Sequence, residues 1–152
     1  MMSSMRVAIV VAEYHHAMTS ELLRAATARL AEHGVSLSSQ DVTWVPGAVE
    51  LPIAAQRYAL TGRFDAIIVF GVVIEGETAH FTYVCQQVSA GVSQVSLTHN
   101  IPVLFGVLTT PSEALTWERL GGNSGHMGIE AADGAVNMVN ALRAIDGESA
   151  GD

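Results

Sequence analysis

Residues 64–85, FDAIIVFGVVIEGETAHFTYVC, contain the pattern that decides the fold. Residues 65–72 form a short apolar run, which is typical of a strand buried on both faces. A loop containing Gly76 follows, and the valines of residues 82–98 recur at helical spacing. A buried strand, a glycine-containing loop and an amphipathic helix make up the repeating unit of a parallel α/β sheet.

The same unit recurs along the whole chain. Because helices separate the expected strands, we predict right-handed crossovers and a parallel sheet covered on both faces. The simplest solution is a flavodoxin-like, doubly wound three-layer α/β/α sandwich with a four-stranded parallel sheet. We expect one domain over residues 1–152, with 1–5 and 147–152 disordered. The other expected strands are 6–12, 37–44 and 102–108, and the other expected helices are 18–33, 50–61, a short helix ending near 120, and 128–144.

Composition excludes several classes of protein. The 152 residues carry a net charge of −8, and all seven cationic side chains are scattered arginines, which argues against a nucleic-acid partner. Without lysine, no enzyme Schiff base can form. Charged residues are only 14% of the chain, so we expect apolar surface to meet other copies of it. No signal-peptide layout or membrane-length apolar run is present, so we expect a cytoplasmic protein without a membrane partner.

The carboxyl ends of the strands are where such sheets bind ligands. This rule selects residues 13–16, 46–50, 71–81 and 108–110. His80 lies near the start of a helix, where an imidazole can transfer protons, although a lone histidine is more often a surface or capping residue. Tyr14 can stack on a ring or simply pack at the rim.

Glu50 and Arg119 have two interpretations each. Glu50 can accept hydrogen bonds from a ligand or stabilise a helix start, and Arg119 can bind phosphate or lie in solvent. The chain has no zinc-ligand spacing and no dinucleotide or Walker motif, so we expect no metal and no nucleotide. Cys85, the single cysteine, fits a core position better than a nucleophile.

Several motifs in the same order resemble the 6,7-dimethyl-8-ribityllumazine synthase family. The resemblance extends from Val7 to Leu142. It implies that 5-amino-6-(D-ribitylamino)uracil condenses with 3,4-dihydroxy-2-butanone 4-phosphate without a cofactor, releasing phosphate and water. The motifs are WVPGAVELPIAAQ (44–56), the opening stretch 64–85, IPVLFGVLTT (101–110) and WERLGGNSGHMGIEAA (117–132).

The resemblance also implies roles for individual residues. His80 matches the proton-transferring histidine, and Arg119 matches a residue that grips phosphate from a neighbouring subunit. Such sites lie between the subunits of a homopentamer, which some family members build into icosahedral shells, and an association with riboflavin synthase is compatible with this. The ribitylaminouracil positions are Tyr14, Ala48, Val49, Glu50, Val72, Val73, Ile74 and, from the neighbour, Phe105; the butanone phosphate positions are Glu77, Thr78 and Arg119.

Several positions depart from the family pattern. Tyr14 replaces the usual Phe or Trp, His15 the frequent Asn, and Val49 a larger residue. Glu75 replaces a basic residue, and Met127 replaces the lysine of a GNKG motif, so anion binding weakens unless His126 compensates. Two hypotheses follow: an active synthase, or a catalytically weak or inactive relative that binds flavin or lumazine or serves as a scaffold.

Overall fold

The structure, a computed structural model, describes residues 4–77 and 79–147. Strands and helices alternate along most of the chain, and short 3-10 helices cover Ser39–Asp41 and Ala48–Glu50. The elements are β1 (Val7–Ala12), α1 (His16–Glu32), β2 (Val42–Val45), α2 (Leu51–Leu60), β3 (Ala66–Ile74), α3 (Phe81–His99), β4 (Val103–Thr110), α4 (Glu113–Glu118), β5 (Leu120–Gly122), β6 (Gly125–His126) and α5 (Met127–Ile145).

The main sheet has four parallel strands in the order β2-β1-β3-β4. Val10 of β1, for example, pairs with Thr43 of β2 on one side and Val69 of β3 on the other. Every residue of β1 and β3 is buried, which explains why both read as uninterrupted apolar runs. The predicted flavodoxin-like α/β fold is confirmed.

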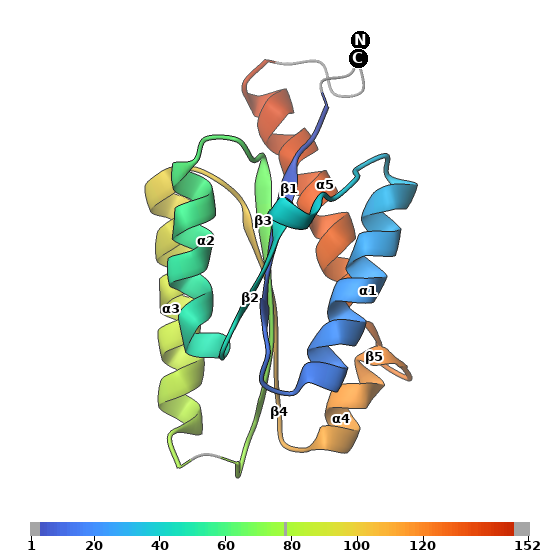
Figure 1. Cartoon of the computed structure of the whole chain (residues 1–152), viewed down its shortest axis with the longest axis vertical. Coiled ribbons are helices and arrows are strands. Elements are labelled where there is room, and N and C mark those ends of the chain that lie inside the picture. Colours follow the sequence, from blue (N-terminus) through green and yellow to red (C-terminus); the bar gives the residue numbers. More distant parts are fainter. Residues whose placement is uncertain (1–3, 78, 148–152) are drawn as a thin grey trace.

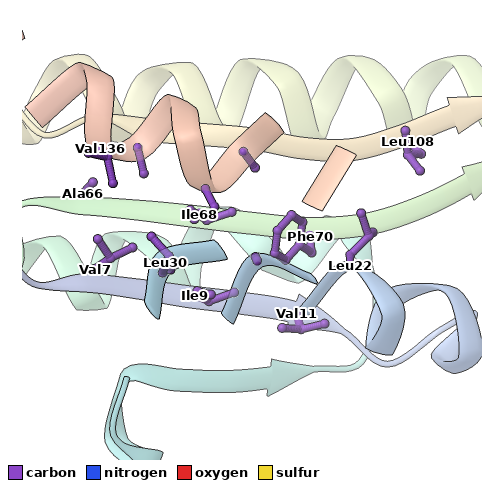
Figure 2. Close-up of a cluster of buried hydrophobic side chains, with 14 of the residues drawn as sticks. Val7, Ile9, Val11, Leu22, Leu30, Ala66, Ile68, Phe70, Leu108 and Val136 are labelled. Carbon is purple, nitrogen blue, oxygen red and sulfur yellow. The ribbon is translucent and has the colours of Figure 1, made fainter. Parts of the chain in front are cut away.

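Helices cover both faces of the sheet. In Figure 1, α2 and α3 lie on one side of the strands, and α1, α5 and α4 lie on the other. Alternate residues of β1 serve the two layers, because side chains of a strand point to opposite faces. Val7, Ile9 and Val11 join the core beneath α1 and α5, whereas Ala8, Val10 and Ala12 join the core beneath α2 and α3. Figure 2 shows the first of these cores, where Phe70 of β3 lies beside Leu22 of α1.

The second predicted strand is too long at its start. Instead of 37–44, the strand covers only Val42–Val45, because a 3-10 turn precedes it. The Asp41 side chain accepts a hydrogen bond from the Ser38 N–H at 3.0 Å and pairs with Arg6 at 3.1 Å. The carboxylate thus binds the backbone locally and competes with strand formation.

The hairpin of β5 and β6 was not predicted. Its strands contain three and two residues, which is too few for an alternating pattern to be visible in the sequence. It links α4 to α5 and brings Leu120 opposite His126.

The expected disordered ends fall partly outside the described residues, namely 1–3 and 148–152. Of the remaining ones, Met5 packs against the core beneath α1 and α5, and the Ser4 carbonyl accepts a hydrogen bond from Arg143 at 3.2 Å. No helix within 4–77 and 79–147 is long and apolar enough to cross a membrane.

Candidate active site

A cleft of about 240 Å³ opens at the carboxyl ends of β1 and β3, where the strand-end rule placed the ligand. Its wall is formed mainly by small and branched apolar side chains, with one aromatic ring, one imidazole and one carboxylate. The lining residues are Tyr14, His15, Gly47, Ala48, Val49, Val72, Val73, Ile74, Glu77 and Val84.

Tyr14 presents an open ring surface to this cleft. The chain leaves β1 and is held to the segment after β2, where the Tyr14 N–H donates to the Pro46 carbonyl at 3.2 Å. The tyrosine is 60% exposed, and its ring meets the His15 ring edge-on at 4.5 Å between centroids. A large aromatic side chain with an uncovered face is suited to stacking on a flat heterocycle.

His15 lines the same cleft; the strand-end rule included it within residues 13–16, but the sequence analysis gave it no role in the site. Its backbone is left-handed, with φ 62° and ψ 48°, and its carbonyl accepts the N–H groups of Met18 and Thr19 at the start of α1. Residues other than glycine rarely adopt this conformation, although histidine is among the enriched exceptions. Its position directly after Tyr14, at the end of a buried strand, was the available signal.

The turn after β3 carries Glu77 into the cleft. The Glu77 N–H donates to the Ile74 carbonyl at 3.3 Å, and Gly76 within this turn has φ 92°, which glycine adopts without strain. The Glu77 carboxylate accepts a hydrogen bond from the Tyr14 hydroxyl at 3.4 Å. Thr78, the other residue expected to bind the butanone phosphate, lies outside the described residues.

Residues 46–50 form the opposite wall. Ala48 and Val49 line the cleft, and Val49 is 38% exposed. Glu50 is half-buried one residue further on, and its Oε1 folds back to 3.3 Å from where a Cβ on Gly47 would lie. The carboxylate therefore lies next to Gly47, which lines the cleft, but is not itself among the lining groups.

His80 lies just before α3 at its N-cap position, and its side chain is exposed. Its carbonyl accepts the Val84 N–H at 2.9 Å, and its ring centroid is 6.3 Å from that of Tyr83. It follows Glu77 by three residues but is not among the side chains that line the cleft.

Two expected site residues, Phe105 and Arg119, are not among those that line the cleft of their own chain. Phe105 of β4 faces α3 and, with Val103 and Leu97, lines a separate groove along the edge of the sheet. Arg119 follows α4, with Nη2 3.5 Å from the Glu130 carboxylate. Its Nε is buried without a hydrogen-bond partner in the described part of the chain.

His126 does not replace the lysine that the GHMG sequence lacks. Its Nδ1 accepts the Gly128 N–H at 3.0 Å, and its Nε2 lies 3.3 Å from Glu21 of α1. The imidazole is only 9% exposed, and both nitrogens are engaged: Nδ1 caps the start of α5, and Nε2 reaches Glu21 of α1. Met127 packs against the core, so neither residue offers a cation to a ligand.

The carboxylate that holds His126 is strongly acidic. Hydrogen bonds, first from Arg24 and then from His126, outweigh partial burial and lower the pKa of Glu21 from 4.5 to about 2.

No three His, Cys, Asp or Glu side chains of residues 4–77 and 79–147 are grouped so as to hold a metal ion.

A flavodoxin-like sheet with an aromatic ring, a carboxylate and an imidazole at its strand ends defines a small α/β protein that binds a flat, polar molecule. Comparison with known proteins narrows this class. The family model for 6,7-dimethyl-8-ribityllumazine synthase matches residues 4–143. Curated 6,7-dimethyl-8-ribityllumazine synthases from three strains of Coxiella burnetii are each 44% identical over 144 residues, covering 95% of both chains. The chain belongs to the 6,7-dimethyl-8-ribityllumazine synthase family.

Proposed function

We propose that this chain is a transferase that condenses 5-amino-6-(D-ribitylamino)uracil with 3,4-dihydroxy-2-butanone 4-phosphate. The product is 6,7-dimethyl-8-ribityllumazine, and phosphate and water are released. The observation that carries the proposal is the single cleft in which Tyr14, residues 48–49 and residues 72–74 meet, in a chain 44% identical to named synthases.

The ribitylaminouracil occupies the cleft in this proposal. Its ring stacks on the exposed face of Tyr14, and its polar edge meets the backbone of Val72, Val73 and Ile74, whose side chains are buried. Glu50, behind Gly47, accepts hydrogen bonds from the ribityl or amino groups. The substrate's own amine forms the imine, so the absence of an enzyme lysine and of a cofactor is compatible with this chemistry.

The phosphate substrate binds beside the turn after β3. His80 transfers protons there as general acid and base, and its exposure leaves the ring accessible to a substrate. Arg119 grips the phosphate with its planar guanidinium. Its Nε, which has no hydrogen-bond partner within residues 4–77 and 79–147, is a donor that such an anion would satisfy. Thr78 completes this subsite in the proposal.

Arg119 and Phe105 reach the cleft from a neighbouring subunit in this proposal. The support is that neither residue lines the cleft of its own chain, together with apolar groups exposed at the edge strand β4 and beside it. Phe105 of β4 is 38% exposed and Leu97 of α3 is 82% exposed. We propose that the protein forms a homopentamer and acts in the cytoplasm. In the same proposal, pentamers can build larger shells, and the assembly can associate with riboflavin synthase.

The test is a direct assay. Purified protein is mixed with both substrates, and the absorbance or fluorescence of the lumazine is followed beside a protein-free reaction. We expect the rate to exceed the uncatalysed condensation by at least about 10²-fold. A rate equal to the protein-free reaction contradicts the proposal and favours a non-catalytic lumazine or flavin binder, which nothing in the fold or comparisons favours now.

A further inference from the structure

Two side chains of the cleft, those of Tyr14 and His15, converge on the carboxylate of Glu77. The Glu77 Oε2 accepts a hydrogen bond from the Tyr14 hydroxyl at 3.4 Å and lies 3.1 Å from His15 Nε2. The Tyr14 and His15 rings pack edge-on against each other at 4.5 Å. Phenylalanine or tryptophan at position 14 would lack the hydroxyl that makes the first of these contacts. Both Tyr14 and His15 therefore contact Glu77 through groups that depend on the residue type at their positions.

Special backbone conformations bring these groups together. His15 has a left-handed backbone, with φ 62°, and a non-glycine residue in that region stores strain that is common at functional sites. Gly76, with φ 92°, turns the chain so that Glu77 comes back over the end of β1. The two elements are neighbours because β1 and β3 pair in the sheet.

His15 Nε2 has an unmet hydrogen-bonding capacity. It is buried and has no aligned partner among the described groups, because its 3.1 Å approach to Glu77 lacks hydrogen-bond alignment. A buried polar atom without a partner in a ligand cleft calls for an explanation. Either a reoriented Glu77 carboxylate or a polar group of the ligand would satisfy it.

Charge argues against a direct role for Glu77 in holding phosphate. A carboxylate next to a phosphate dianion repels it, so this side chain does not add anion affinity. Its contacts instead join the end of β1, which carries the stacking ring, to the turn that leads into His80 and α3. A tether at this point fixes the distance between the bound ring and the proton-transferring group.

We propose that His15 and Glu77 form a positioning pair, assisted by the Tyr14 hydroxyl, that holds the turn after β3 in register with the bound ribitylaminouracil. The inference rests on the proposed function and deepens it. Neither side chain reacts: His15 and Glu77 act through the placement of His80 and of the ring on Tyr14.

A double-mutant cycle on kcat tests the pair. His15→Gly removes the imidazole and suits the left-handed backbone, and Glu77→Ala removes the carboxylate. We expect each variant to lower kcat about threefold to tenfold, and the double variant to be no slower than the slower single one. If the fold-changes in kcat of the two single variants multiply in the double variant, His15 and Glu77 act independently, and the proposed pair is wrong.

The balance between kcat and KM separates positioning from anion binding. Glu77→Ala should lower kcat without raising KM for the butanone phosphate, and Glu77→Gln, which keeps an acceptor for both partners, should recover most of kcat. An unchanged kcat in Glu77→Ala would contradict the proposal. Should His15→Gly fail to assemble, the cycle is run with Tyr14→Phe, which removes a single hydroxyl, and non-additivity is again expected.

Glu75 provides the matched control. It is an exposed carboxylate two residues earlier in the same turn, and none of its side-chain contacts joins it to His15 among the described residues. The effects of Glu75→Ala and His15→Gly on kcat should therefore multiply.

If the wild-type protein shows no turnover, the proposed function fails. The His15/Glu77 double-mutant cycle is then measured on the dissociation constant of 6,7-dimethyl-8-ribityllumazine instead of on kcat. Non-additivity in that constant supports the pair, and additivity overturns it.

Discussion

At the scale of single residues, His80 gives the most direct prediction. If its imidazole transfers protons, His80→Ala should lower kcat about a hundredfold, at the lower end of general acid–base effects because the substrates also condense unaided. Steady-state kinetics measures this, and light scattering should show unchanged assembly. His99→Ala, at the opposite end of the same helix, is the control and should keep the wild-type kcat. An unchanged kcat in His80→Ala would remove the histidine from the mechanism.

Arg119 is expected to act on one substrate only. Arg119→Ala should raise KM for the butanone phosphate about tenfold or more, because a charge-assisted contact to the anion is lost, and should leave KM for ribitylaminouracil nearly unchanged. Arg57→Ala, an exposed arginine on α2, serves as the control. Equal changes in both Michaelis constants would contradict a phosphate clamp.

The sequence identified most of the cleft residues but not their mutual contacts. Tyr14 lies just after the buried strand β1, and residues 72–74 are the last three of the buried strand β3, so the strand-end rule found them. The left-handed backbone of His15 and its approach to Glu77 depend on two segments more than sixty residues apart along the chain, and no local pattern reports such a pairing.

At the scale of elements, the crossing of α1 and α5 depends on Gly128. A Cβ at this position would lie 2.6 Å from the Leu22 carbonyl, a backbone atom that cannot move alone. Gly128→Ala should therefore lower the free energy of unfolding by about 1–3 kcal/mol, measured by urea denaturation at fixed protein concentration.

Gly134→Ala is the matched control in the same helix. Its Cβ would meet the flexible end of Leu104 at 3.0 Å, and alanine has the better helix propensity. Its free energy of unfolding should stay within about 1 kcal/mol of wild type. If both variants had the same free energy of unfolding, the close approach of α1 and α5 would not restrict the size of the side chain at position 128.

Acid should weaken the contacts of the Glu21 carboxylate, first with Arg24 on the same helix and then with His126 at the start of α5. Because the pKa of Glu21 is lowered from 4.5 to about 2, its ionised form stabilises the fold above about pH 4.5 and loses this effect as the pH falls through about 2. Glu21→Gln should thus be less stable than wild type near neutral pH, and the deficit should shrink in acid. Urea denaturation from about pH 7 to about pH 3 measures this.

Glu32→Gln serves as the control for this titration. Glu32 lies on the same helix and pairs with Arg29 at 3.1 Å, but its side chain is 67% exposed, where ion pairs contribute little. We expect a small deficit at every pH. A Glu21→Gln deficit that stays constant with pH would mean that its ionisation does not stabilise the fold.

At the scale of the whole molecule, subunit mixing tests where the site lies. His80→Ala and Arg119→Ala proteins are each expected to be impaired. In mixed assemblies, an Arg119→Ala subunit supplies an intact His80 to a neighbour that supplies an intact Arg119, so about a quarter of sites are complete after random mixing. Activity should therefore rise above that of either variant when the two are refolded together. No recovery would place both residues in one subunit.

The sequence by itself determined the layered fold and the edge of the sheet that binds ligand. Strand and helix periodicity, glycine turns and the order of elements along the chain are local or nearly local signals, so β1, β3 and the helices beside them were found. Motif order along the chain was also enough to indicate the family that the comparisons confirm.

The tertiary structure alone decided how side chains from distant segments meet. It showed that His126 is held by Gly128 and Glu21 and so cannot replace the lost lysine, and that Phe105 and Arg119 do not line the cleft of their own chain. These outcomes depend on packing between α1, α5 and the strands, and on side-chain directions set by the whole fold. Contacts of this kind are non-local, so residue patterns along one segment do not contain them.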